Sequence, residues 1–335
     1  MNFFNIYPFV LEKQDKVSSS KKILITTNFK LQGKKLNDLF SVFMHKLSDH
    51  FIDLNERGLA VSKFLNENKF NLIVVNSIRD ISGFFLNQHK KKSKVLNISH
   101  GTISASYNKY DQIYKKNIAD SVVTNKANYV VAQSKISENF LNQNKYKKKI
   151  IKGNLIFSQV KKISNEYLLY ATTTKTFYNM QFLGVEMYYE FFENLKFLNK
   201  FAYINKVKII VKLHPSEIKN SNKLKKIFNS LFFSTSNIQK LLKKSFASLS
   251  FSSTVIEDSL NSKVPVILFD RWNRYKHCKI IDSKDNKAPL FHIKKKDDLL
   301  ACVQKIQKQN NFDFSDYIFS DGYKKNLKNK ITKLF

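Results

Sequence analysis

The chain has 335 residues, of which 43% are hydrophobic, and this is enough apolar material for the cores of two α/β domains or of one large one. Its formal net charge of +32 comes mostly from lysines, which favours anionic partners without choosing among nucleic acid, an anionic membrane surface and a phosphorylated substrate. The two cysteines, Cys278 and Cys302, exclude a disulfide framework and a zinc site, so we expect a reducing compartment.

The N-terminal segment MNFFNIYPFVLEKQDK has an apolar start. It lacks the basic region and the uninterrupted apolar core of a secretory signal peptide. No window of the sequence approaches the ~20 apolar residues that a membrane span needs. We therefore expect a cytoplasmic protein, whose positive charge could hold it at the anionic inner face of the membrane.

Apolar runs alternate with helical patterns along the whole chain, which is typical of parallel α/β sheets. In the first half, strands are predicted at 22–27, 70–76, 95–98, 129–134 and 150–157, with helices at 36–65, 78–89 and from 134 to 140. In the second half, strands are predicted at 167–171, 207–213, 246–251 and 264–269, with helices at 177–201, 224–231, 238–243, 254–263, 297–307 and 323–335.

This alternation falls into two successive α/β halves. A basic, polar connection at 145–149 and a hinge near 150–165 separate them. We expect an N-terminal domain over 1–160 and a C-terminal domain over 161–315. A terminal helix over 316–335 could pack back on the N-terminal domain.

Hydroxyl residues and histidines follow several of the predicted strands. Because ligands gather at the carboxyl ends of parallel strands, these residues mark the expected site. The segments concerned are Thr26-Thr27, Ser99 to Thr102, Thr172-Thr173-Thr174, His214 to Glu217 and Ser250 to Thr254.

The most informative stretch runs from Lys244 to Arg271, where Ser252, Ser253 and Thr254 form a polar turn before a helix. Hydroxyls beside the unpaired N–H groups of a helix start can hold a phosphate. In this interpretation the acidic residue of the first turns, Glu257, reaches a neighbouring sugar hydroxyl. The alternative is an ordinary helix cap, because Ser-x-x-Glu spacing is common at helix starts that bind nothing.

His214 strengthens the phosphate interpretation, since it follows a strand and precedes Pro215, which fixes the backbone. It could donate to a phosphate oxygen or act as a general acid, or it could merely bond a local carbonyl. His100 has the equivalent place in the first half and could deprotonate an incoming hydroxyl, or it could pack under the next helix. Asp111 and Asp120 are weaker candidates for the same role.

Several motifs are absent from the sequence. It has no Gly-x-Gly-x-x-Gly and no Walker A motif, which argues against a nicotinamide dehydrogenase and a P-loop nucleotidase. It also has no Gly-x-Ser-x-Gly elbow and no cluster with metal-ligand spacing. A site of hydroxyls, histidines and a helix start needs neither metal nor cofactor to hold a phosphate, and a sugar-nucleotide enzyme fits that set.

The segments HPSE, at 214–217, and SFSSTVIEDSLNSKVPVI, at 250–267, resemble the C-terminal half of GT-B-fold bacterial surface-polysaccharide transferases. These include capsule and lipopolysaccharide transferases of CMP-activated Kdo or sialic acids, and CDP-glycerol glycerophosphotransferases. Ser-His-Gly-Thr at 99–102 is similar to the His-Gly-Thr segment of the glycerophosphotransferases, although a Trp usually stands where this chain has Ser99. The acceptor-side acidic motif of bacterial sialyltransferases is absent.

The resemblance implies two Rossmann-like parallel-sheet domains facing across a cleft, with the acceptor on the N-terminal one and the nucleotide donor on the C-terminal one. It assigns His214 and His100 as catalytic residues. It also implies a nucleotide site that contains His214, Ser252, Ser253 and Glu257. The expected site further includes the neighbouring Pro215 and Thr254, and the residues Thr172 and Thr173 that follow a strand.

The leading hypothesis is a metal-independent cytoplasmic glycosyltransferase of capsule or lipopolysaccharide synthesis. It would move a CMP-activated Kdo or nonulosonate to a glycan or glycolipid acceptor. One alternative is a transferase of CDP-glycerol or CDP-ribitol, and another is an enzyme like the UDP-N-acetylglucosamine 2-epimerases, which share the fold. A nucleic-acid-binding protein is the non-enzyme alternative, and the diffuse charge argues against it.

Overall fold

The structure is a computed structural model. It describes residues 23–26, 59–60, 62–68, 70–75, 92–99, 109, 112, 127–144, 149–172, 184–250, 253–269, 287–293, 295, 297–320, 327 and 329–333. The chain divides into two compact units. The first comprises residues 1–133, 137–155 and 321–335, and the second comprises 134–136 and 156–320.

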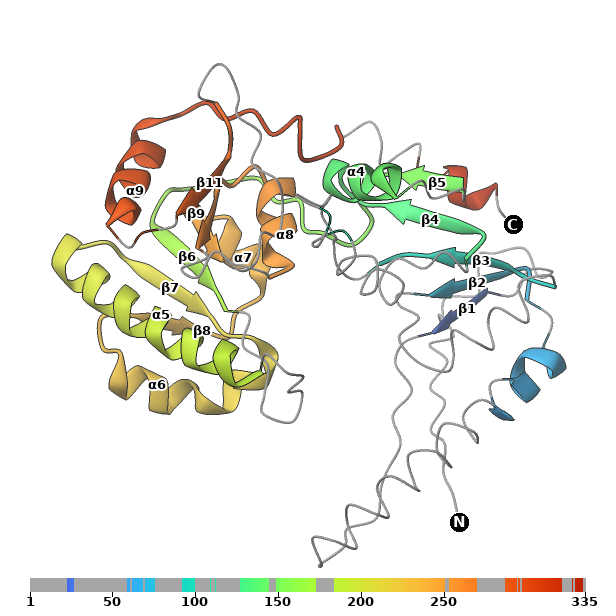
Figure 1. Cartoon of the computed structure of the whole chain (residues 1–335), viewed down its shortest axis with the longest axis horizontal. Helices are drawn as coiled ribbons and strands as arrows, with labels where there is room; N and C mark the ends of the chain where they lie inside the picture. Colours follow the sequence, from blue (N-terminus) through green and yellow to red (C-terminus); the bar gives the residue numbers. More distant parts are fainter. Residues whose placement is uncertain are drawn as a thin grey trace, which may run out of the picture. The chain divides into compact units, whose positions relative to one another are not determined.

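The first unit contains a five-stranded parallel sheet in the order β1-β2-β3-β4-β5 (Figure 1). Apolar side chains cover both faces, which explains why these strands read as continuous apolar runs. The strands are β1 (Ile23–Thr26), β2 (Leu72–Val75), β3 (Lys94–Asn97), β4 (Tyr129–Ala132) and β5 (Lys149–Lys152), and helix α4 (Lys135–Gln143) follows β4.

The end of β5 differs from the sequence prediction, which extended the strand to 157. The strand stops at Lys152 because Gly153 has a φ of +148°, a conformation that side-chain-bearing residues rarely adopt. A Cβ at this position would lie 2.8 Å from Cδ2 of Leu327. Leu327 is fully buried and packs with Leu72 and Ile151, so the C-terminal segment contributes to the core of the first unit.

The second unit contains a six-stranded parallel sheet in the order β11-β10-β9-β6-β7-β8. The chain starts in the middle at β6, fills one side with β7 and β8, and then returns to the other side. The strands are β6 (Tyr167–Ala171), β7 (Ile209–Lys212), β8 (Phe232–Ser234), β9 (Ser245–Ser250), β10 (Val266–Phe269) and β11 (Leu290–Ile293). The strand order therefore reverses between β6 and β9, which is the usual place for a ligand in such sheets.

Helices cover both faces of this second sheet (Figure 1). One face carries α5 (Gly184–Asn205), α6 (Ser221–Ile227) and α9 (Asp298–Lys308), whose apolar side chains pack with those of the central strands. The other face carries α7 (Ile238–Leu242) and α8 (Val255–Asn261). The aromatic residues of α5 belong to this core, since Phe191 and Phe201 are buried and Phe197 stacks on Phe269.

Two strands of the second sheet were not predicted from the sequence. β8 has only three residues and lies at one edge, and β11 lies at the other edge and contains the polar His292. Helix α6 ends at Ile227, earlier than predicted, because the chain must turn before β8. The predicted helix at 78–89 and most of the one at 36–65 lie outside the described residues.

Helix α8 ends in a Schellman motif that contains a lysine where glycine is usual. Val264 N donates to Ser259 O at 2.9 Å and Lys263 N donates to Leu260 O at 3.0 Å, while Lys263 has a φ of +56°. The left-handed conformation is strained for any residue that has a Cβ, and this strain destabilises the folded state. Glycine adopts the conformation without that strain.

We therefore expect Lys263→Gly to raise the free energy of unfolding by about 1 kcal/mol, measured by urea denaturation. Lys243→Gly is the matched control, because Lys243 ends α7 with a φ of −58°. That control should lower stability by roughly 0.5–1 kcal/mol through its added backbone entropy. Equal effects of the two changes would contradict the strain at Lys263.

Candidate functional site

The carboxyl ends of three adjacent strands, β9, β6 and β7, are joined by hydrogen bonds from hydroxyl side chains. Ser250, the last residue of β9, donates from its Oγ to the carbonyl of Ala171 at 2.9 Å. Thr172, the residue after β6, accepts through Oγ1 from the backbone N–H of His214 at 2.8 Å. The structure therefore brings Thr172, His214 and the end of β9 together at the point where the strand order reverses.

The backbone of His214 is held on both sides. Its N–H binds Thr172, and its carbonyl accepts from the N–H of Glu217 at 2.8 Å. Pro215 then begins the 3-10 helix η3 (Pro215–Asn220), a position where proline loses no hydrogen bond. The His214 side chain is half-buried and Pro215 is exposed. A partly accessible imidazole is therefore attached to a fixed backbone turn at the carboxyl edge of the sheet.

The turn before α8 uses Ser253 to hold the first N–H groups of the helix. Its Oγ accepts from Val255 N at 3.2 Å, and its carbonyl accepts from Ile256 N at 3.0 Å. Thr254, the exposed N-cap residue, makes no side-chain capping bond among the described residues. Ser253 thus caps the helix in part, as the ordinary-cap alternative requires. Because its hydroxyl accepts in that bond, its own O–H stays available for donation to a phosphate oxygen.

Glu257 lies in the first turn of α8 and is fully buried. Its Oε1 accepts from the hydroxyl of Ser134 at 3.4 Å, and Ser134 is itself fully buried within the second unit. A carboxylate at this position interacts favourably with the positive end of the helix dipole. Contact with a ribose hydroxyl would require the Glu257 side chain to become accessible.

The next residue of α8 binds the segment that leads into the second unit. Oδ1 of Asp258 accepts from Ser158 N at 2.6 Å, and one turn later Ser262 donates from Oγ to Ser158 O at 3.0 Å. The same Ser262 Oγ accepts from Val160 N at 3.2 Å. Sequence reasoning missed Ser134, Asp258 and Ser262. The spacing of Asp258 and Ser262, four residues apart on a helix, places them on one face and was the available signal.

In the first unit, polar groups also gather at the carboxyl ends of strands. The Gln133 side chain, after β4, donates to the carbonyl of Ser99, after β3, and accepts from Leu155 N at 3.3 Å. Asn97, the last residue of β3, is fully buried, and its side-chain amide has no hydrogen-bond partner among the described residues. Of these strand ends, that of β3 leads directly to the segment that contains His100.

Five of the sequence-predicted candidates lie outside the described residues, namely His100, Thr173, Ser252, Asp111 and Asp120. Of the predicted nucleotide-site members, Thr172, His214, Pro215, Ser253, Thr254 and Glu257 are described, and all belong to the second unit. In the described part of the chain, no group of His, Cys, Asp or Glu residues could hold a metal ion. Within the same ranges, no helix is both long enough and apolar enough to cross a membrane.

The pKa of Asp258 is raised from its ordinary value of 3.8 by burial, against the lowering effect of the bonds from Ser158. A raised pKa means that the folded protein holds this proton more tightly than the unfolded chain. The free energy of unfolding therefore falls as the pH rises through the interval above 3.8. Asp313 has the opposite sign, because hydrogen bonds from Ser315 lower its pKa.

We expect Asp258→Asn to gain stability relative to the unchanged protein as the pH rises above 3.8, since the amide keeps an oxygen for Ser158 and carries no charge to bury. Asp313→Asn should instead lose relative stability as the pH rises toward 3.8 from below. Urea denaturation across acidic and neutral pH measures both curves. If the stability of both variants relative to the unchanged protein varied with pH in the same way, the opposite pKa shifts assigned to Asp258 and Asp313 would be wrong.

No protein-family model matches the chain, and a comparison with curated proteins gives no match. Solved structures match at low sequence identity. The UDP-GlcNAc 2-epimerase of Methanocaldococcus jannaschii, in complex with UDP-GlcNAc and UDP, is 13% identical, with a TM-score of 0.53 over 84% of this chain and 80% of that one. The UDP-N-acetylglucosamine 2-epimerase of Rickettsia bellii is 13% identical, with a TM-score of 0.50 over 83% and 76%.

The lipopolysaccharide outer core galactosyltransferase WaaB also matches, at 12% identity and a TM-score of 0.44 over 85% of this chain and 82% of that one. At such identities a likeness concerns the fold. The two all-parallel sheets, together with the likeness to the two epimerases, confirm that the chain has the expected α/β, GT-B-like fold.

Proposed function

We propose that the protein is a metal-independent, nucleotide-sugar-dependent glycosyltransferase that acts in the cytoplasm on a surface glycan or glycolipid. The observation that carries the proposal is the pair of bonds from Ser250 to Ala171 and from His214 to Thr172. They gather a half-buried histidine and a hydroxyl-bearing helix start at the strand-order reversal of a parallel sheet, where nucleotides bind in such folds.

In the proposed reaction, the acceptor oxygen attacks the anomeric carbon as the bond from that carbon to the donor phosphate oxygen breaks. The bonding electrons leave with the nucleotide. His214 stabilises the negative charge that develops on this leaving group, and Ser252, Ser253 and the start of α8 hold its phosphate. His100 takes the proton of the acceptor hydroxyl. Thr172 is assigned to positioning, because it fixes the backbone of His214.

The donor proposed from the sequence resemblance is CMP-activated Kdo or a nonulosonate. A CDP-glycerol or CDP-ribitol donor would instead transfer a phosphodiester. The complex of the Methanocaldococcus jannaschii epimerase with UDP-GlcNAc and UDP favours a second candidate function, conversion of a UDP-sugar without an acceptor. One series of measurements can identify the nucleotide, the sugar and the need for an acceptor.

Thermal shifts with CMP, CDP and UDP first identify the nucleotide. Turnover of the matching sugar donor is then measured with and without a glycan acceptor. A glycosyltransferase releases free nucleotide in proportion to the glycosylated product, whereas the proposed epimerase converts one UDP-sugar into another with no net release of nucleotide. Absence of any nucleotide-dependent shift would refute both functions.

We expect His214→Ala to weaken nucleotide binding or the transition state by ~1.5–3 kcal/mol, or roughly 10- to 150-fold, because one charge-assisted phosphate contact is lost. Calorimetric titration with the nucleotide and steady-state kinetics measure the two effects. His292→Ala is the matched control, since this histidine lies on the edge strand β11. Unchanged affinity and turnover in His214→Ala would remove His214 from the site.

Glu257→Gln tests the proposed ribose contact. A carboxylate that accepts from a ribose hydroxyl should lose about tenfold in affinity for the ribonucleotide on this change, because a hydrogen bond to a charged group becomes a neutral one. Affinity for the corresponding 2′,3′-dideoxynucleotide should stay the same. Equal losses for both nucleotides would show that Glu257 supports α8 through Ser134 and does not touch the ribose.

A further inference from the structure

The amino edge of the second sheet, opposite the candidate site, is rich in exposed lysines. Because the strands are parallel, the residues that precede them all lie at this edge. Lys206 and Lys208 precede β7, and Lys243 and Lys244 precede β9, and all four are exposed. We call these four residues the lysine edge.

The sequence around this edge is unusually poor in acidic residues. From 194 to 256, which spans the second half of α5 and continues past β9 to the start of α8, lysine occurs in every helix before α8 and in β7, and two more lysines directly precede β9. Glu217 is the sole acidic residue of this stretch. Glu217 is buried after β7, at the opposite edge. The charge of the chain is therefore more localised in this region than the overall composition indicated.

Side-chain contacts connect the lysine edge across four adjacent strands. Nζ of Lys244 lies 3.1 Å from Oε1 of Glu166, next to the start of β6. Nζ of Lys208 lies 5.9 Å from the ring centroid of Tyr167, on β6, and 5.7 Å from that of Phe232, on β8. The starts of β9, β6, β7 and β8 thus form one continuous band.

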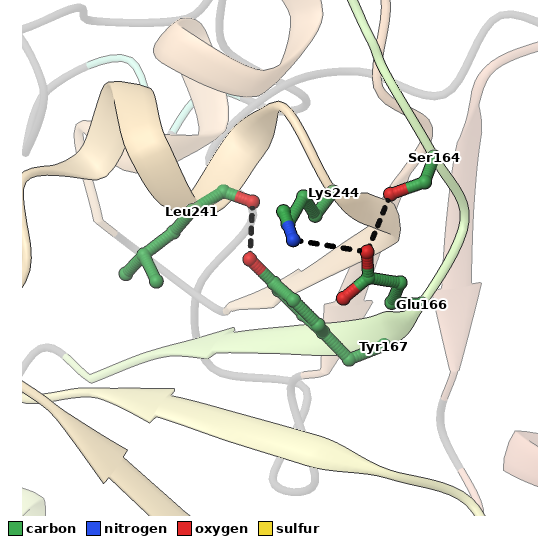
Figure 2. Close-up of polar contacts among 5 residues, drawn as sticks. All are labelled: Ser164, Glu166, Tyr167, Leu241 and Lys244. Atoms are coloured by element: carbon green, nitrogen blue, oxygen red, sulfur yellow. Dashed lines mark hydrogen bonds and ion pairs between the residues drawn. The ribbon is translucent and has the colours of Figure 1, made fainter.

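Glu166, the acidic residue in this band, is neutralised locally, as Figure 2 shows. Its Oε1 accepts from the hydroxyl of Ser164 at 2.8 Å and pairs with Lys244. These two hydrogen bonds lower the pKa of Glu166, and the charges of Lys244 and Lys208 add to the effect. Tyr167 is held by donating from its hydroxyl to Leu241 O at 2.8 Å (Figure 2). Lys206, Lys208 and Lys243 remain as a net positive group.

Large apolar side chains accompany these lysines. Tyr203, Ile204 and Phe232 are 66%, 59% and 56% exposed. Nζ of Lys206 lies 4.8 Å from the Tyr203 ring, and Lys208 contacts Phe232. Lysines interleaved with exposed aromatic and aliphatic side chains suit the interface of an anionic bilayer, where the charges meet lipid headgroups and the apolar groups enter the acyl boundary. Single-stranded nucleic acid would use aromatic stacking but give Ile204 no role.

We propose that the lysine edge, with Tyr203, Ile204 and Phe232, binds the surface of an anionic lipid bilayer. The contact leaves the opposite edge of the same sheet, which carries His214 and Ser253, available for ligands. It does not depend on the proposed transferase activity, because the two sets of residues lie at opposite ends of the strands.

The test is co-sedimentation of the full chain with vesicles of phosphatidylcholine alone or mixed with phosphatidylglycerol. We expect the chain to bind the vesicles that contain phosphatidylglycerol and not those of phosphatidylcholine alone. Added salt should weaken this binding. Replacing Lys206, Lys208 and Lys243 together by Gln should lower the partition coefficient about 100-fold, at about fivefold per lysine. The charge-matched control replaces Lys149, Lys330 and Lys333, which are exposed residues of the first unit, and should change it far less.

A second pair of variants separates the apolar contribution. Ile204→Ser with Phe232→Ser should reduce the binding that remains at high salt, whereas Leu59→Ser, at a residue of the first unit that is 61% exposed, should not. Thermal shifts with nucleotide should be the same for all lysine variants, which keeps this test separate from that of the proposed function.

Three outcomes would overturn the proposal: no binding to anionic vesicles, equal losses in the two lysine triples, or binding of single-stranded RNA that the edge triple abolishes while vesicle binding persists unchanged.

Discussion

The pairing of β6 with β9 on one side and with β7 on the other is the constraint on which the candidate site depends. This pairing places the carboxyl ends of three strands side by side, although more than seventy residues of chain separate β6 from β9. Two hydroxyl side chains, of Ser250 and Thr172, then cross-link these ends. Because both bonds are made by buried side chains to backbone groups, they fix where the chain turns after each strand.

Helix α8 connects the site to the rest of the second unit. Its first turn follows the Ser253 turn and carries Glu257, which binds Ser134, and its next residue, Asp258, binds the segment at 158. A change at the start of α8 would therefore be transmitted to both segments, through the long, buried bond of Glu257 and the short, partly buried bond of Asp258. The burial that raises the pKa of Asp258 also strengthens its bond with Ser158, because water competes for it poorly.

The two ends of the second sheet have different chemical character. The carboxyl edge presents a histidine and hydroxyls, and it is built by bonds between strand ends. The amino edge presents lysines and apolar side chains, and its acidic residue is already paired with Lys244. A parallel sheet separates these two sets by the length of its strands, so a single domain can offer one surface to a soluble ligand and another to a lipid surface.

Much of the fold could be predicted from the sequence, since apolar runs such as 72–75 and 266–269 are strands buried on both faces, and α5 is the aromatic-rich helix that its pattern indicated. The edge strands β8 and β11 could not, because they are short and only partly buried, which leaves no continuous apolar run to recognise. The boundaries expected near residue 160 and the roles of His214, Ser253 and Glu257 stay predictions.

The sequence by itself determined the types of the central elements and the residues that follow the central strands, because burial on both faces and local turn chemistry are evident in short segments. Only the tertiary structure decided which strand ends are neighbours, that Glu257 is buried against Ser134, and that Asp258 and Ser262 hold residues 158–160. These facts depend on strand order and on contacts between segments about a hundred residues apart, and no local pattern records them. The lysines gather at one edge for the same reason, since parallel strands collect at one end of the sheet residues that are scattered along the chain.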